Sequence, residues 1–177
     1  MNSNMNMREK IKEIFLIEAE KNKYSKVPVT TICQSARINR STFYFYFEST
    51  EKLLDEIEYD FISQIPFVDC FSDSATIYGQ ILRYVRYVSS HKNVFFTLIK
   101  NGKLISAFMD RSNAKSNQIA TRRLRIEKQE MPHLLASYTT IGSIALLETW
   151  LTYYPEYPSE KIAHIICNQA LAATKNY

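Results

Sequence analysis

The chain has few of the residues that interrupt helices. Its 177 residues include three glycines and five prolines. Long stretches between them carry apolar residues at helical spacing. This scarcity of helix breakers, together with that spacing, predicts an almost wholly α-helical protein with a core in one or two small domains.

Segments that direct a protein into or across a membrane are missing as well. No stretch approaches the roughly 20 apolar residues of a membrane-spanning helix, and the N-terminal residues lack the apolar centre and cleavage site of a signal peptide. Cys33, Cys70 and Cys167 have no CxxC spacing and are odd in number, which suits a reducing compartment. We therefore expect a cytoplasmic protein with no membrane association.

The residue constellations of enzymes are also lacking. The sequence shows no nucleophile–base pair and no Gly-rich phosphate loop. His91, His133 and His164 are far apart, with no partner at metal-ligand spacing. We expect no catalytic residue, no metal site and no cofactor.

What the chain does carry is a mildly basic charge at its N-terminal end. The formal net charge is +4 and the sequence pI is about 8.9. Residues 1–50 hold eight Lys and Arg against five Glu, and so most of the excess. This balance is compatible with a nucleic-acid partner but does not establish one.

The most informative segment is residues 29–54. It opens with apolar residues at positions i, i+3, i+4 and i+7, which share a single helical face: Val29, Ile32, Cys33 and Ala36. A turn at residues 36–38 follows, and Asn39 is expected to cap the next helix with its side chain. That helix carries Phe43 and Phe47 for the core. The pattern is typical of a helix-turn-helix whose second helix enters the DNA major groove.

Arg, hydroxyl and Tyr side chains remain on the outer faces of this second helix. Arg40 can reach a guanine edge or a phosphate, whereas Tyr44 and Tyr46 suit phosphates. Thr30 and Thr31 begin the first helix, where they can receive a phosphate or simply cap the helix. The alternative for the whole set is a solvated helix face. The predicted DNA-binding residues are Thr30, Thr31, Arg40, Ser41, Thr42, Tyr44, Tyr46 and Lys52.

Residues 38–47, INRSTFYFYF, are similar to the recognition-helix signature of the TetR family of transcriptional regulators. In that signature a Thr-Phe-Tyr triplet is followed, after one residue, by an aromatic or His and then Phe. Residues 49–54 are similar to the start of the family's fourth helix. The resemblance covers roughly a sixth of the chain and is closest to a subgroup with a compact helical C-terminal domain.

Three positions depart from the family pattern. Arg37 stands where the family usually has Gly in the turn, and a non-Gly residue at positive φ costs on the order of 1 kcal/mol. Pro28 stands where Thr is frequent, which the first helical turn tolerates. Thr50 stands where a phosphate-contacting Lys is common. Lys52 can replace that Lys, although it points roughly 200° around the helix from Thr50.

The resemblance implies an all-α fold of about nine helices. An N-terminal three-helix DNA-binding domain with its linking helix (residues 1–65) would precede a helical regulatory and dimerisation domain (residues 66–177). The helical spacing and the prolines place helices at residues 7–22, 75–90, 94–109, 116–129, 133–154 and 159–176. Two more helices lie on either side of the turn at residues 36–38, and a further helix begins at Ser49 and ends before Pro66.

The last two helices carry more apolar residues than one face can hold. In the first of them, one stripe consists of Leu134, Tyr138, Ile141 and Ala145, and another of Leu135, Gly142, Leu146 and Trp150. In the second, Ile165 and Ile166 belong to different faces. A helix that is apolar on two sides must be buried on two sides. The resemblance implies a homodimer through these helices; the alternative is a deeply buried core in a monomer.

Aromatic residues in the second domain can line an inducer pocket or serve ordinary core packing. The candidates are Tyr84, Phe95, Phe108, Tyr138 and Trp150. The sequence with its resemblance thus predicts a repressor that binds a palindromic DNA operator as a homodimer and is released by a small apolar ligand. The alternative is a TetR-like protein-interaction module regulated by a partner protein.

Overall fold

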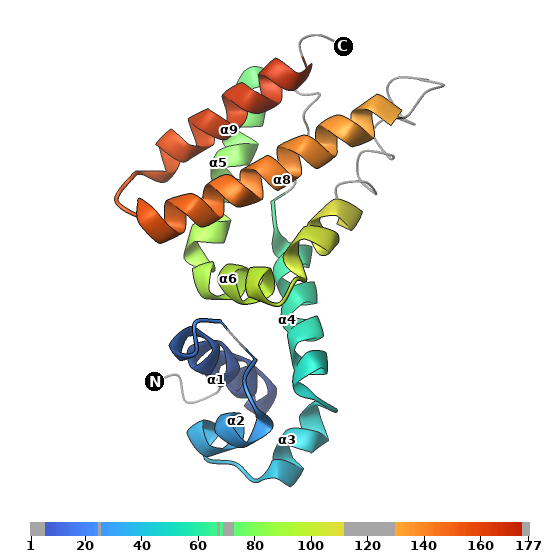
Figure 1. The fold of residues 1–177 in the computed structure, drawn as a ribbon, viewed down its shortest axis with the longest axis vertical. Helices are drawn as coiled ribbons and strands as arrows, with labels where there is room; N and C mark the ends of the chain where they lie inside the picture. Colours follow the sequence, from blue (N-terminus) through green and yellow to red (C-terminus); the bar gives the residue numbers. More distant parts are fainter. Residues whose placement is uncertain (1–5, 25, 67, 69–72, 112–129, 175–177) are drawn as a thin grey trace. The chain divides into compact units, whose positions relative to one another are not determined.

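The computed structural model describes residues 6–24, 26–66, 68, 73–111 and 130–174. Within them the chain is all-α, as predicted, with helices and no strand (Figure 1). The helices are α1 (Met7–Lys21), α2 (Val29–Ala36), α3 (Arg40–Tyr46), α4 (Thr50–Gln64), α5 (Ser74–Ser90), α6 (Lys92–Lys100), α8 (Glu130–Tyr153) and α9 (Ser159–Thr174). Residues 104–111 are helical as well. The helix predicted at residues 116–129 and Cys70 lie outside the described residues.

The chain forms two compact units. The head unit consists of Met1–Ser63 and Asn93–Leu104, and the body unit of Gln64–Lys92 and Ile105–Tyr177. The chain therefore crosses between the units three times. The predicted two-domain division after residue 65 stays a prediction, and the head unit additionally gathers a segment from much later in the sequence.

The core of the head unit follows from apolar residues at helical spacing. Helix α1 packs on α2, and α2 on α3. The side chains at the centre are almost completely buried: Ile11, Ile32, Phe43, Leu53 and Phe95. Phe47, just beyond the end of α3, is also buried at 4% exposure, so both phenylalanines predicted for the core are confirmed.

Ion pairs hold α1 against α4. The Nζ of Lys12 lies 2.7 Å from Glu56 Oε1 and 2.6 Å from Asp60 Oδ2, and Arg8 makes a paired hydrogen bond with the same Glu56. Burial alone would lower the pKa of Lys12, but hydrogen bonds to Asp60, Glu56 and Glu9 raise it. The hydrogen bond from Arg8 lowers the pKa of Glu56 to about 2, with burial opposing and Lys12 adding to the effect. The charged forms of this cluster are therefore favoured in the folded protein.

The segment Asn93–Leu104 joins the head unit through polar and aromatic contacts. Asn101 Nδ2 donates to the Tyr24 carbonyl at 3.2 Å, and the Tyr24 ring stacks on Phe96 with ring centroids 5.2 Å apart. Asn93 Nδ2 donates to Glu20 Oε2 at 2.8 Å. Lys23 and Tyr24 both have positive φ, which costs free energy in non-glycine residues. These contacts hold the α1–α2 loop in that unfavourable conformation.

The prediction of a single helix at residues 94–109 is wrong, because the helix ends at Gly102. Gly102 has φ +71°, and its N–H donates to the Ile99 carbonyl at 3.0 Å. The next N–H, of Lys103, donates to the Leu98 carbonyl at 3.0 Å. This pair of bonds is the Schellman closure that glycine favours at a helix end, and it ends α6.

The body unit is built around α5, α8 and α9. Helix α5 packs on α9 and on α8, and α8 and α9 form an antiparallel pair joined by a short turn (Figure 1). The most deeply buried side chains include Ile77, Ile81, Val85, Leu147 and Ala163. Helix α8 begins at Glu130, earlier than predicted, so that Pro132 lies in its first turn, where a missing N–H is tolerated. No helix in the described residues is long and apolar enough to cross a membrane.

Candidate nucleic-acid interface

Helix α2 and the turn after it set the direction of α3. Ile32, Cys33 and Ala36 are buried, which confirms the apolar face predicted for α2. The helix ends at Arg37, which has φ 55° and ψ 50°. The N–H of Ile38 donates to the Cys33 carbonyl at 3.0 Å, and that of Arg37 to the Gln34 carbonyl at 3.2 Å. The turn is therefore a Schellman closure with Arg where Gly is favoured.

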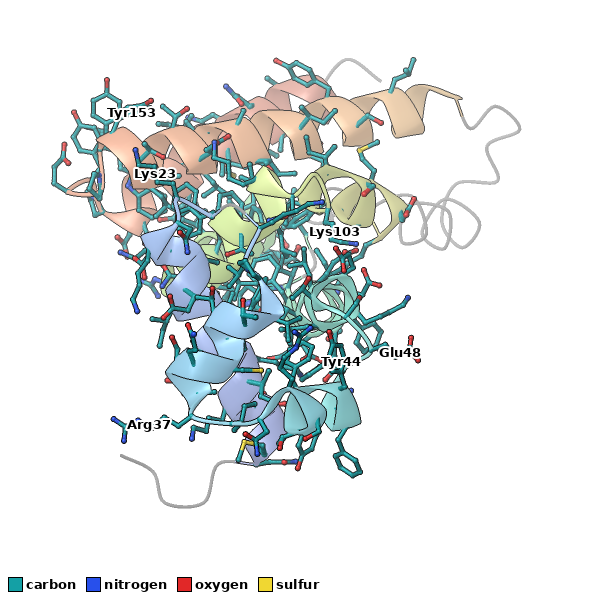
Figure 2. All side chains as sticks on the ribbon, turned by 60° about the horizontal axis from the view of Figure 1, so that its bottom comes forward. Lys23, Arg37, Tyr44, Glu48, Lys103 and Tyr153 are labelled. Atoms are coloured by element: carbon teal, nitrogen blue, oxygen red, sulfur yellow. The ribbon has the colours of Figure 1, made fainter. Side chains whose placement is uncertain are left out.

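The turn between α2 and α3 exposes the side chain of Arg37, which is not among the predicted DNA-binding residues. The residue is exposed and its side chain points away from the helices of the head unit beside the α2–α3 turn (Figure 2). A long cation displayed from a turn next to α3 is suited to a phosphate oxygen. The available signal was a charged residue at a position that requires positive φ.

Helix α3 begins differently from the prediction. Asn39 occupies its N-cap position, but the Asn39 side chain makes no capping hydrogen bond, so the predicted side-chain cap is wrong. The Asn39 carbonyl accepts the first helical bond, from the N–H of Phe43 at 3.2 Å, and the side chain is exposed. The Asn39 amide is therefore open to solvent.

The structure brings two of the predicted DNA-binding residues together on α3. Arg40 Nη2 donates to the Tyr44 hydroxyl at 3.4 Å, and the guanidinium carbon lies 5.9 Å from the Tyr44 ring centroid. Hydrogen bonding to Tyr44 raises the pKa of Arg40. Both side chains are exposed, as is Ser41, whereas Thr42 is half-buried. Arg40 and Tyr44 thus form one cationic, hydroxyl-bearing flank of α3.

Tyr46 lies on the other flank of the helix. It is half-buried, and its ring meets the Phe45 ring edge-on with centroids 5.0 Å apart. At the start of α2, Thr30 is exposed and Thr31 is half-buried. Pro28 holds the N-cap position there, with no side-chain capping bond, so the hydroxyls of the two threonines are not used as N-caps.

The start of α4 supplies the remaining predicted residue. Ser49 Oγ accepts from the N–H of Lys52 at 3.2 Å, which confirms Ser49 as the cap of this helix. Lys52 is exposed, and its Nζ lies 3.2 Å from Asp55 Oδ2. The other oxygen of Asp55 accepts from Lys103 Nζ at 2.6 Å, and hydrogen bonding to Lys103 lowers the pKa of Asp55. Asp55 therefore keeps its negative charge even when Lys52 turns to another anion.

The residues predicted to bind a ligand belong to both units, four to the body unit and one to the head unit. Tyr84 and Phe108 meet edge-on in the body unit, with centroids 6.0 Å apart, and burial raises the pKa of Tyr84. Trp150 is buried, and its indole N–H donates to the Tyr157 carbonyl at 3.1 Å. Tyr138 is 65% exposed, and Phe95 belongs to the head unit. A pocket lined by all five residues stays a prediction.

Helix α8 exposes one of the two apolar stripes predicted for it. Leu134, Tyr138 and Ile141 are 63%, 65% and 45% exposed, and the small residues Gly142 and Ala145 adjoin them. The opposite face of the helix is buried in the body unit, through Ile144, Leu147 and Trp150. In α9, Ile165 is exposed whereas Ile166 is buried. We refer below to Leu134, Tyr138, Ile141 and Ala145 as the α8 stripe.

No candidate metal-binding site is present among the residues that the structure describes. No group of three or more His, Cys, Asp or Glu side chains is arranged there to hold an ion. Cys33 and Cys167 are buried thiols, and burial raises the pKa of each. A raised pKa disfavours the reactive thiolate, as expected for structural cysteines.

A relative among the curated proteins resembles a portion of this chain. No protein-family model matches the sequence. The HTH-type dhaKLM operon transcriptional activator DhaS of Lactococcus lactis subsp. lactis (strain IL1403) is 31% identical over 83 residues. The match covers 45% of this chain and 41% of that protein, so the chain matches less than half of the length of this relative.

Solved structures resemble nearly the whole chain at low sequence identity. A dihydroxyacetone kinase operon activator DhaS matches with a TM-score of 0.63 and 19% identity, over 98% of this chain and 99% of that one. A TetR-family regulator from Streptomyces coelicolor gives 0.69 and 17%, over 94% and 79%. The fatty acid degradation regulator FadR from Bacillus halodurans gives 0.70 and 10%, over 98% and 99%.

Proposed function

We propose that this chain, which has the fold of the TetR-family transcriptional regulators, is itself a transcriptional regulator that binds DNA through α2 and α3. The observation that carries the proposal is the construction of α3. Its core side is closed by Phe43, while Arg40 and Tyr44 share a contact on an exposed flank. A short helix held this way can enter a major groove with its cation and hydroxyls directed at the DNA.

The individual contacts follow from chemistry. Arg40 suits the O6 and N7 acceptors of a guanine, and Tyr44 suits a phosphate oxygen. Lys52 can leave the exposed pair with Asp55 for a phosphate, because Lys103 remains to neutralise Asp55. Arg37, Thr30, Thr31, Ser41, Thr42 and Tyr46 complete the proposed DNA-facing set.

The proposed regulator acts as a homodimer. The α8 stripe leaves large apolar side chains in water, and a second copy of the chain would cover them. Two heads then engage two half-sites, which predicts a palindromic operator. The alternative is that α8 is a core helix buried on all sides within a monomer, and this alternative does not account for the exposed Leu134 and Tyr138.

The regulator is proposed to be a cytoplasmic repressor that a small apolar ligand releases from DNA. A ligand in the body unit would favour a head spacing that no longer matches successive grooves. Two alternatives rest on particular observations. The relative with 31% identity is an activator, which favours positive control. The 65% exposure of Tyr138 and the hydrogen bond of the Trp150 indole to the Tyr157 carbonyl favour a partner protein over a small molecule as regulator.

The decisive experiment is selection of bound sequences from a random pool of double-stranded DNA, followed by mobility-shift titration. We expect a palindromic sequence to be enriched and its affinity to fall steeply with salt. Arg40→Ala should weaken the enrichment and relax it at one base pair, and Glu13→Gln, on an exposed position of α1, should leave it intact. Failure of the unaltered protein to enrich any sequence at low salt would refute DNA-specific regulation.

A promoter reporter separates the two signs of control. Deletion of the gene for a repressor raises expression from a promoter that carries the selected sequence, and deletion of the gene for an activator lowers it. Trp150 is the single tryptophan and is buried in the body unit, so its fluorescence reports a ligand that binds there. A partner-regulated protein would show no such response to small apolar molecules.

A further inference from the structure

The most exposed large apolar residue among those described is Phe45, in the last turn of α3. Its side chain is 81% exposed, although it lies between the buried Phe43 and Phe47 in the sequence. Successive residues of a helix are separated by about 100°, so Phe45 lies opposite the mean direction of those two core residues. The outermost line of α3 is therefore occupied by an aromatic hydrocarbon ring.

The neighbours of Phe45 fix its position rather than cover it. The Tyr46 ring meets it edge-on, at an interplanar angle of 89° and a centroid distance of 5.0 Å. Ser41, four residues earlier on the same line, is small and exposed. Arg40 and Tyr44 pair with each other on one flank. The Phe45 ring is thus an exposed apolar group next to the polar flank of α3.

We propose that Phe45 reads the 5-methyl group of a thymine in the major groove. The inference rests on the proposed DNA-binding function and names a specificity determinant within it. A phenyl ring offers no hydrogen bond, so it cannot recognise the donor and acceptor pattern of a base. Thymine is the one ordinary base that presents an apolar group in the major groove, and contact with that methyl removes hydrocarbon surface from water.

The same ring disfavours other bases at that position. Placing it against the N4 amino group of a cytosine or the O6 and N7 atoms of a guanine would strip water from polar groups without replacing their hydrogen bonds. The preference for thymine therefore combines one favourable contact with penalties for the alternatives. Arg40, on the adjacent flank, would read a neighbouring base pair by hydrogen bonds.

The test replaces each thymine of the selected operator half-site, one at a time, by deoxyuridine. This exchange removes the 5-methyl group and leaves the Watson–Crick edge unchanged. We expect one position at which the unaltered protein loses about fourfold in affinity, the value for one buried methyl-sized group. Phe45→Ala should bind the thymine and deoxyuridine operators equally, and Phe45→Leu should retain some of the difference.

A matched control and separate outcomes make the test decisive. Tyr59→Ala removes another exposed aromatic side chain of the head unit, 73% exposed on α4, and should keep the deoxyuridine effect. Specific DNA binding with no deoxyuridine effect at any position would overturn the role of Phe45 and leave the proposed function intact. Absence of any specific DNA binding would overturn both. Unchanged DNA affinity of Phe45→Ala together with a lost protein partner would assign the ring to that partner instead.

Discussion

The head and body units expose different kinds of side chains, mainly polar and cationic on α3 and apolar on α8. In the head unit, α1, α4 and the segment Asn93–Leu104 are tied by ion pairs and hydrogen bonds, and the exposed side of α3 carries mainly Arg, hydroxyl and Tyr groups. In the body unit, α8 buries one apolar face and exposes another. Figure 2 shows Arg37 projecting from the head unit and Tyr153 from the end of α8.

This difference supports the two partners that we propose, DNA for the head unit and a second copy of the chain for the body unit. A surface with a cation, hydroxyls and one exposed phenyl ring complements phosphates and base edges. A helix face with Leu134, Tyr138 and Ile141 complements another apolar protein surface. We therefore propose that two copies of the chain dimerise through their body units, and that the two head units of the dimer bind the two half-sites of one operator.

The largest expected effect comes from placing a charge on the α8 stripe. Ile141→Glu should give monomers and lower the operator affinity by at least about 100-fold, because two linked heads gain that much from simultaneous binding. Sedimentation and mobility shift measure the two effects. Ile105→Glu is the matched control, because Ile105 is similarly exposed in the body unit but outside α8 and α9. A dimer that survives Ile141→Glu would place the interface elsewhere. Ile166 is unsuitable for this test because it is buried.

A smaller effect is expected from the cation of the recognition helix. Arg40→Ala should weaken binding roughly 10- to 100-fold and relax the preference at one base pair, as loss of a guanine contact does. Tyr44→Phe should weaken binding to all sequences alike, because a phosphate contact carries no base information. Selection of bound sequences with each variant distinguishes the roles. A changed base preference in Tyr44→Phe alone would exchange the two assignments.

The polar ties of the head unit predict a pH dependence of its stability. The folded-state pKa of Glu56 is about 2, below the ordinary 4.5. The carboxylate therefore stabilises the fold above about pH 4.5, and this contribution is lost as the pH falls from 4.5 toward 2. Glu56→Gln should lower the free energy of unfolding at pH 7 by about 1–2 kcal/mol, after allowance for solvent screening.

Denaturant unfolding across that pH range checks the prediction. The difference between the unaltered protein and Glu56→Gln should shrink as the pH falls, because protonation removes the same charge. Glu13→Gln, on an exposed position of α1, should leave the curve unchanged. A constant difference from pH 7 to pH 2 would show that the Arg8–Lys12–Glu56 cluster contributes packing rather than charge.

The smallest effect separates stability from function at the α2–α3 turn. Arg37→Gly relieves the positive φ of Arg37 but frees the unfolded chain, so we expect a gain of about 0.5 kcal/mol in stability. The same change should weaken DNA binding and reduce its salt dependence, because one phosphate contact is lost. Arg37→Ala keeps the unfavourable φ and removes only the cation. Equal DNA affinity for all three proteins would leave Arg37 without a DNA role.

The helices of the head unit could be predicted well from the sequence. The first helix of the predicted helix-turn-helix corresponds to α2, and Phe43 and Phe47 are buried as predicted, because apolar residues at a spacing of three and four lie on one face of a helix. Single residues that favour a helix start or a helix end were less reliable as predictors. Asn39 is a favoured cap type whose side chain nevertheless makes no cap, and Gly102 was overlooked as the end of α6.

The candidate site was only partly predictable. Arg40 and Tyr44 lie together and exposed on α3, as expected from their positions. Arg37 and Phe45, which we propose as additional DNA-contacting residues, are not predicted from the sequence, because their exposure depends on a backbone angle and on the direction of the buried side. The spacing of the proposed ligand-binding residues in the sequence does not predict whether they line one pocket, since Phe95 and Tyr84 belong to different units.

The sequence by itself determined most of the helical segments described and placed the buried Phe43 and the exposed Arg40–Tyr44 flank on α3. These features depend on residues within about two turns of each other, and so on the 3.6-residue period alone. Only the tertiary structure decided that Asn93–Leu104 folds with the head unit, that Glu56 meets Arg8 and Lys12, and that Ile141 is exposed while Ile166 is buried. A periodic sequence defines an apolar face, but which element covers that face is settled by contacts between residues far apart in the chain.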